Sequence, residues 1–231
     1  MTDHPTLDVS HLPAEVRDAR APAWWGNTLF MFIETSTVLL LVASYLYLWR
    51  NYPQGNWPPP MSDRDPPLLD PVPDLAFGTA NFVLMLLSVP VMMLTMRVAE
   101  QQFDDLERAN LAKENETFQR PEQKVKVLVG LGVMTLVAVA ACLLRWFEFD
   151  GLLVRWDDNP YGSVVWALLC LHLLYLVIEF VEFTILTVWV AKYGFGENQA
   201  TDVLLTGDYW YWTVGVGGLI YGLVYWFPRL T

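Results

Sequence analysis

The fold class is decided by one stretch of sequence, GSVVWALLCLHLLYLVIEFVEFTILTVWV, which runs from Gly162 to Val190. A bilayer core of roughly 30 Å requires about 20 apolar residues in helical form. This stretch is longer than that, and its only charged side chains are Glu179 and Glu182. Because lipid offers no hydrogen-bond partners to the backbone, we expect the stretch to cross the membrane as a helix.

Four other segments share this apolar character, and tryptophans flank several of them, as they do at membrane interfaces. These segments are Trp24–Trp49, Leu75–Met96, Val127–Leu144 and Tyr209–Phe227. Only the first of them contains a charged side chain, Glu34. The sequence therefore predicts an all-α integral membrane protein, with five transmembrane helices in a single bundle over residues 24–231.

The overall composition supports this class and excludes others. Hydrophobic residues make up 54% of the chain and charged residues only 17%, whereas about a quarter of the residues in a soluble domain are charged. The formal net charge is −11, which opposes binding to the phosphates of a nucleic acid. We therefore expect contacts with lipids and proteins and none with nucleic acid.

Lysine and arginine are distributed unevenly between the two sides of the predicted bundle. Nine lie in the N-terminal tail and in the loops after the second and fourth spans, and five lie on the opposite side. Because positively charged loops tend to stay in the cytoplasm, we expect the N-terminus in the cytoplasm and the C-terminus outside. Residues 1–23 are polar and are expected to form a flexible cytoplasmic tail, with no cleavable signal peptide.

The two longest loops differ in composition. Residues 53–73 contain eight prolines, which predicts a stiff and extended segment. Residues 97–124 are rich in charged residues, glutamine and other good helix formers. We therefore expect the second and third spans to continue into the cytoplasm as a helical hairpin.

Ionisable side chains inside the spans are the candidate functional residues, because they usually face the bundle interior or a water-filled cavity. Glu34 lies about 15 Å into the first span at 1.5 Å per residue. In the fourth span His172, Tyr175, Glu179 and Glu182 are spaced so that all four share one helix face. This stripe is either proton-linked or headgroup-binding, or it is a hydrogen-bonded packing stripe, and the spacing leaves these alternatives open.

A metal or haem site held by this chain alone is disfavoured by its residues. His172 is the only histidine within a span, so two histidines cannot hold a haem inside the bundle. Glu179 and Glu182 could share one ion only with further ligands. Sequence patterns of zinc proteases, phosphate-binding loops and serine hydrolases do not occur either. We therefore expect no catalytic residues, no metal site and no cofactor in this chain.

Short motifs in all five spans resemble one known family, subunit III of the haem-copper oxidases. In order along the chain they are Leu29-Phe30 with Glu34 and Tyr45-Leu46-Tyr47, Asn81 with Leu86-Leu87-Ser88, Phe147-Glu148-Phe149, Asp158 to Ser163 with His172, and Tyr209-Trp210. The chain departs from the family pattern at Ile33, Tyr175, Glu179 and Tyr211, two of which stand where the family has histidine. The resemblance is therefore to a divergent branch in the five-helix form, which lacks the family's first two helices.

The resemblance implies an accessory subunit without redox centres in the bacterial cytoplasmic membrane. Haem and copper are then held by partner subunits, and this chain packs against the catalytic subunit I, binds phospholipid and supports proton uptake during O2 reduction. By its motif, Glu34 corresponds to the family's buried glutamate near the subunit I contact. Glu148 and His172 match further family positions, whereas Glu179 and Glu182 are candidates from their spacing alone.

Two other functions are compatible with the same sequence. The first is an accessory subunit of a nitric oxide reductase, since such a protein resembles the same family. The second is a small transporter or proton channel that uses the polar stripe of the fourth span, although five unmatched spans provide no inverted repeat. The neighbouring subunits distinguish the first alternative from an oxidase, and flux through the isolated chain in liposomes identifies the second.

Overall fold

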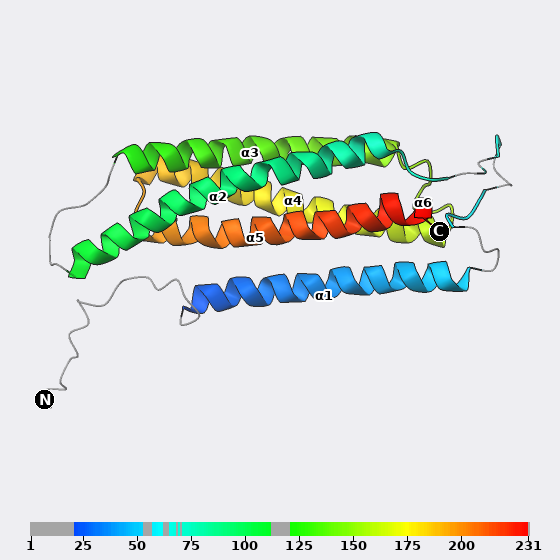
Figure 1. The fold of residues 1–231 in the computed structure, drawn as a ribbon, viewed down its shortest axis with the longest axis horizontal. Coiled ribbons are helices and arrows are strands. Elements are labelled where there is room, and N and C mark those ends of the chain that lie inside the picture. The colour runs from blue at the N-terminus through cyan, green and yellow to red at the C-terminus, as the bar shows by residue number, and fades with distance from the viewer. Residues whose placement is uncertain are drawn as a thin grey trace, which may run out of the picture.

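The computed structural model describes residues 21–52, 57–61, 65–67, 69, 71–111 and 121–230, and every regular element among them is a helix (Figure 1). Five of the helices are long, and a short π-helical segment interrupts the last one. In chain order they are α1 (Pro22–Asn51), α2 (Leu75–Leu111), α3 (Pro121–Asp150), α4 (Pro160–Tyr193), α5 (Glu197–Tyr221), η1 (Gly222–Trp226) and α6 (Phe227–Leu230).

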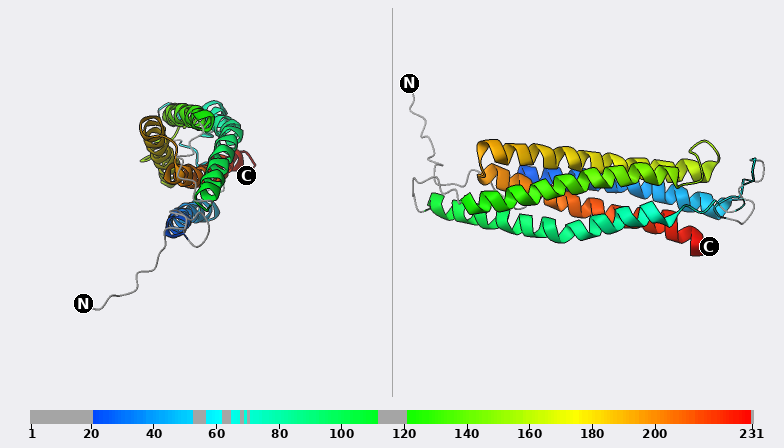
Figure 2. Two further views of the ribbon diagram at one scale, coloured as in Figure 1. Left: turned by 90° about the vertical axis from the view of Figure 1, so that its left-hand side faces the viewer. Right: turned by 90° about the horizontal axis from the view of Figure 1, so that it is seen from above.

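Four of the long helices form a ring, and the fifth lies outside it. Helix α2 packs against α3, α3 against α4, α4 against α5, and α5 back against α2. Helix α1 packs only against α4 and α5 among these contacts, and the end-on view in Figure 2 shows it outside the ring. Side chains that point into the ring are therefore enclosed by four helices, whereas those on α1 can meet only one edge of it.

The ends of α4 follow from local sequence. Asn159 caps its first turn by accepting a hydrogen bond from the backbone N–H of Gly162 at 2.8 Å, and Pro160 takes the first helical position. At the other end Gly194 has a φ of 96°, and its N–H donates to the carbonyl of Val190. A positive φ of this kind favours glycine, so the chain turns directly from α4 into α5.

Four helices are long and apolar enough to cross a membrane, which indicates a multi-pass membrane protein and confirms the predicted all-α membrane class. They cover Pro22–Asn51, Leu75–Gln102, Pro121–Asp150 and Pro160–Tyr193. The fifth predicted span differs, because its helix begins at Glu197 rather than at Tyr209. The first half of this helix carries acidic residues, which lower its hydropathy. A prediction from hydropathy alone therefore places the start of the helix too late.

The predicted helical extensions beyond the second and third spans are present. Helix α2 continues past Gln102 to Leu111, and α3 begins at Pro121, but the turn between them, residues 112–120, lies outside the described residues. Residues 1–20 of the predicted tail and residues 53–56, 62–64, 68 and 70 of the proline-rich loop are outside them as well. Helix α1 begins at Pro22, slightly before the predicted start of the first span.

Close helix contacts in the ring depend on glycine, as is usual where lipid removes the hydrophobic drive between helices. Gly130 of α3 lies against Thr95 of α2, and an added Cβ would come within 2.1 Å of the threonine Oγ1. Thr95 cannot move away easily, because its hydroxyl donates to the carbonyl of Val91 at 2.9 Å. Gly132, two residues further along α3, has nothing within 4 Å of the same position.

These two glycines give a matched test of the α2–α3 contact. We expect Gly130→Ala to destabilise the protein by about 1–3 kcal/mol, the usual result of overpacking. Gly132→Ala should be neutral or stabilising, since alanine is the better helix former by about 1 kcal/mol. Thermal unfolding in detergent measures both, and equal behaviour of the two variants would show that the helices are not packed this closely.

Candidate functional site

A buried ion pair lies inside the ring near the end of α3. The Arg145 guanidinium donates to the carboxylate of Glu148 at 2.5 Å, and both side chains are almost fully enclosed. Their separation of three residues places them on one face of α3. The phenol of Tyr225, in the π-helical segment η1, donates to the same carboxylate oxygen of Glu148. The pair therefore joins α3 to the last helix of the chain.

His172 of α4 completes this cluster, which we call the arginine network (Arg145, Glu148, His172 and Tyr225). Arg145 Nη2 lies 3.0 Å from His172 Nδ1, and His172 Nε2 lies 3.1 Å from the carbonyl oxygen of Thr213. A guanidinium group only donates hydrogen bonds and a carbonyl only accepts them. Nδ1 must therefore be the acceptor, and the single ring proton sits on Nε2. His172 is thus held as a neutral imidazole between two helices.

Helix α2 closes the fourth side of the arginine network with small and polar residues. Gly78 lies against the ring of Tyr225. One turn of α2 or more further on, the side chain of Met85 packs beside His172, and both side chains lie against the backbone of Gly217. Between Gly78 and Met85 on this face of α2 lies Asn81, which is almost fully buried. Its amide has no hydrogen-bond partner among the described residues. Asn81 therefore leaves polar atoms free beside the network.

A second polar cluster, the carboxyl cluster (Glu34, Glu179, Glu182 and Tyr209), lies where α1 meets α4 and α5. The Tyr209 hydroxyl donates to Glu34 Oε2 at 2.7 Å, which buries the Glu34 carboxylate against α5. Thr206 Oγ1 donates to Glu182 Oε2 at 3.4 Å. Glu34, Glu179 and Glu182 are close enough to interact electrostatically. This cluster contains three acidic groups from two helices.

Glu179 is the unusual member of the carboxyl cluster. Its side chain has no exposed surface, and neither carboxyl oxygen makes a well-formed hydrogen bond within the described part of the chain, although the Thr213 hydroxyl is close enough to interact with it. The neighbouring Tyr175 is also buried with an unpaired hydroxyl there, and its ring packs edge-on against Trp212 at 5.0 Å. Buried polar atoms are normally paired, so these atoms distinguish the cluster from an ordinary packing contact.

A pocket of about 250 Å³ opens beside the carboxyl cluster at the end of the bundle where α4 ends and α5 begins. Its polar lining consists of Asn27, Glu182, Asp202 and Thr206, and Trp189 forms part of its apolar wall. Asn27 Nδ2 donates to the carbonyl of Leu205 at 3.0 Å, which fixes this corner of α1 to α5. Glu182 therefore lines an open pocket while Glu179, one turn away, is enclosed.

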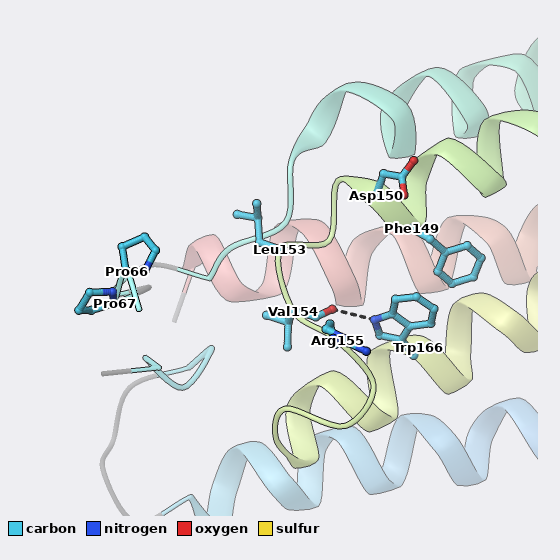
Figure 3. A pocket seen from close by; sticks show the side chains of 8 residues that line it. All are labelled: Pro66, Pro67, Phe149, Asp150, Leu153, Val154, Arg155 and Trp166. Carbon is cyan, nitrogen blue, oxygen red and sulfur yellow. Dashed lines mark hydrogen bonds between the residues drawn. The ribbon is translucent and has the colours of Figure 1, made fainter. Parts of the chain in front are cut away.

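A larger pocket of about 550 Å³ lies at the opposite end of the bundle (Figure 3). It is lined by Pro66 and Pro67 of the proline-rich loop, by Asp150 at the end of α3 and by residues of the α3–α4 connection, among them Arg155. The Trp166 indole donates to the carbonyl of Val154 at 2.7 Å and so holds this connection against α4. The residues that line this pocket include none of the predicted site residues.

The predicted site residues fall into two groups in space. His172 and Glu148 meet through Arg145, whereas Glu34, Glu179 and Glu182 gather at the edge of the ring, with Tyr175 beside them. All four residues of the α4 stripe are buried or half-buried, and the two ends of the stripe contact different partners.

Sequence reasoning missed Arg145 and Tyr225 as members of the first group. The charge count treats Arg145 as a loop residue, but it is buried inside α3. The i, i+3 spacing of Arg145 and Glu148 at the end of an apolar run is the signal that could have identified the pair. Tyr209 belongs to a family motif, but the motif does not indicate its hydrogen bond to Glu34, and no local pattern distinguishes Tyr225 from other interfacial aromatics.

No family model matches the chain, and a search of curated proteins finds no matching sequence. Among the described residues no three histidine, cysteine, aspartate or glutamate side chains come together in a way that could hold a metal ion. The interpretation of the site therefore rests on the geometry of these two clusters and on the sequence motifs.

The arginine network should dominate the stability of the ring. We expect Arg145→Met to destabilise the protein by about 3–5 kcal/mol, because it leaves the Glu148 carboxylate buried without its cation. Arg155→Met is the matched control, since that arginine pairs with Asp157 on the surface at 3.5 Å and such pairs contribute less than about 1 kcal/mol.

Thermal unfolding of both variants in the same detergent measures the difference. A double variant with Arg145→Met and Glu148→Leu should recover part of the loss, because it removes both charges together. Equal melting temperatures for Arg145→Met and Arg155→Met would contradict the assignment of Arg145 to a buried pair.

Proposed function

We propose that this chain is an accessory subunit III, in the five-helix form, of a respiratory haem-copper terminal oxidase. In this role it holds no redox centre, stabilises the catalytic subunit I in the bacterial cytoplasmic membrane, and supports proton uptake during O2 reduction. Haem and copper belong to the partner subunits, and phospholipid fills the surface that the proteins leave open. The four long apolar helices are the structural basis for placing it in a membrane.

The observation that carries the proposal is that motif residues far apart in the sequence pair with one another in space. Glu34 of the first motif accepts a hydrogen bond from Tyr209 of the last at 2.7 Å. Ser88 of the second motif accepts one from the Trp210 indole at 3.0 Å. Residues that are shared with a family for functional or packing reasons are expected to meet in this way, whereas chance matches are not.

The third and fourth motifs are linked in the same manner. Arg145 donates to Glu148 and contacts His172, which connects the two motifs across α3 and α4. The family's second histidine is replaced by Tyr175, whose ring still packs in the interior beside Trp212. The first, second and last motifs are therefore joined by hydrogen bonds in one group, and the third and fourth motifs are joined in another.

The same proposal includes five spans, with the N-terminus in the cytoplasm and the C-terminus outside. Helix α5 packs against both α2 and α4 and completes the ring (Figure 2), which supports its role as the fifth span despite its acidic start. Because Arg145 is buried, the count of basic residues on the outer side falls from five to four. The bias of positive charge toward the cytoplasmic side is thereby strengthened.

The first test is purification of the chain from its native membrane in mild detergent. We expect haem-bearing subunits to copurify with it, because the proposed role is to pack against the catalytic subunit, and we expect the isolated chain to be colourless. Mass spectrometry and absorption spectra of the purified complex provide the measurement.

Two results would contradict the oxidase assignment. Copurification with the subunits of a nitric oxide reductase would assign the chain to that complex instead. A chain that purifies alone and conducts protons or a substrate in liposomes would favour a transporter or channel.

A second test concerns Glu34 within the assembled complex. We expect Glu34→Ala to leave assembly mostly intact but to impair sustained turnover, because it removes a carboxyl group that Tyr209 holds in the interior. Glu34→Gln is the matched control for shape, since it keeps an acceptor for Tyr209 but cannot release a proton from a carboxyl group. Oxygen consumption followed over many turnovers measures the effect, and unchanged rate and lifetime in both variants would exclude a proton-linked role.

A further inference from the structure

The carboxyl cluster and the neighbouring pocket place several proton-accepting groups near one another. The pocket of about 250 Å³ is open at the end of the bundle and brings Glu182 and Asp202 to its wall. Glu182 is half-buried there and also accepts a hydrogen bond from Thr206. A carboxylate in this position can exchange protons with water from the pocket.

Glu179 occupies the next position inward. It lies three residues before Glu182 on the same helix face, which corresponds to about one turn. Its carboxyl group is fully enclosed, and in the part of the chain that the structure describes it makes no well-formed hydrogen bond, with only the Thr213 hydroxyl close enough to interact as a donor. An isolated charge in such a place is costly, so the group needs a bound proton or an ordered water beside it.

Tyr209 and Glu34 occupy the inner end of the series. The Tyr209 hydroxyl donates to Glu34 Oε2 at 2.7 Å and interacts electrostatically with Glu179 and Tyr175. A phenolic hydroxyl both donates and accepts a hydrogen bond. Tyr209 can therefore stand between the carboxyl group on α4 and the carboxyl group on α1.

We propose that protons pass from the pocket through Glu182, Glu179 and Tyr209 to Glu34, so that the chain contains a proton path of its own. Glu179 begins with a bound proton and gives it to Tyr209, while the Tyr209 hydroxyl proton moves to the Glu34 carboxylate. Glu182 then takes a proton from water and returns to a carboxylate when it gives that proton to Glu179. Each intermediate group ends as it began, and the net result is one proton moved from the pocket to Glu34.

This path goes beyond the proposed function, because neither carboxyl group on α4 matches a family motif and the path is complete within this chain. The arginine network is a separate structure. His172 belongs to the same α4 stripe but lies about two turns from Glu179, and Arg145 occupies its Nδ1 and the Thr213 carbonyl occupies its Nε2. Titration of His172 is therefore not part of the path.

Infrared spectroscopy of the full chain in lipid nanodiscs tests the path directly. A protonated carboxyl group in a dry interior gives a carbonyl stretching band that is well separated from that of a carboxylate, and the band shifts when deuterium replaces the proton. We expect Glu179→Gln to remove one such band. The time course of the shift after transfer to D2O then measures how quickly the pocket delivers protons to this site.

Substitutions along the path should change that time course in order. Glu182→Gln should slow exchange at Glu179 by about 10²-fold, the lower end of what a positioned proton-transfer group contributes. Tyr209→Phe should slow exchange at Glu34 and leave exchange at Glu179 fast. Asp157→Asn is the matched control, because it removes an exposed carboxylate at the opposite end of the bundle and should change neither rate.

Asn27→Leu provides an independent variant that removes no carboxyl group. It places an apolar side chain in the wall of the pocket and should also slow exchange at Glu179, so it decides the question if Glu182→Gln does not fold. The path is wrong if exchange at Glu179 stays at the wild-type rate in a folded variant of either kind, or if Glu179→Gln removes no protonated band. These results need no haem-bearing partner, so they are independent of the copurification test.

Discussion

The guanidinium group of Arg145 is the constraint on which the interior of the ring depends. Arginine stays charged in proteins, and a charge inside a membrane bundle must be paired there. Arg145 meets this requirement through Glu148 on its own helix and His172 on α4. Tyr225 binds the same carboxylate from the last helix. One charge thereby fixes the relative positions of three helices, which apolar side chains of similar size would not specify as closely.

Helix α1 depends on a different set of contacts. In lipid, apolar faces have little reason to prefer another helix over the surrounding chains, and the outer face of α1 is apolar. Its specific attachments to α5 are hydrogen bonds at three levels: Asn27 to the Leu205 carbonyl, Glu34 to Tyr209, and Thr35 to the Trp212 indole. The functional candidate Glu34 is therefore also one of the contacts that hold α1 in place, which is why its substitution needs a control that preserves the hydrogen bond.

Hydropathy was sufficient to predict most of the fold, because lipid allows few alternatives to a helix of about 20 apolar residues. It failed at two places. Arg145 lies inside α3 although the charge pattern assigned it to a loop, and α5 begins at Glu197 although its first half is acidic. Tertiary partners decide the first case. In the second, the Gly196 N–H donates to the Gln199 side chain at 3.0 Å and caps the start of the helix, and a hydropathy average contains no information about either kind of contact.

The period of 3.6 residues predicted that His172, Tyr175, Glu179 and Glu182 share one face of α4, but not that this face divides between two environments. The division follows from the ring, because α3 supplies a cation near His172 and no cation pairs with Glu179 among the described residues. Both nitrogens of His172 are occupied, so it can pack and orient but cannot exchange protons without breaking a contact. Glu179 has at most its contact with the Thr213 hydroxyl to lose. The two ends of the stripe therefore differ: His172 is held by two contacts, and the carboxyl end is where we propose proton-linked chemistry.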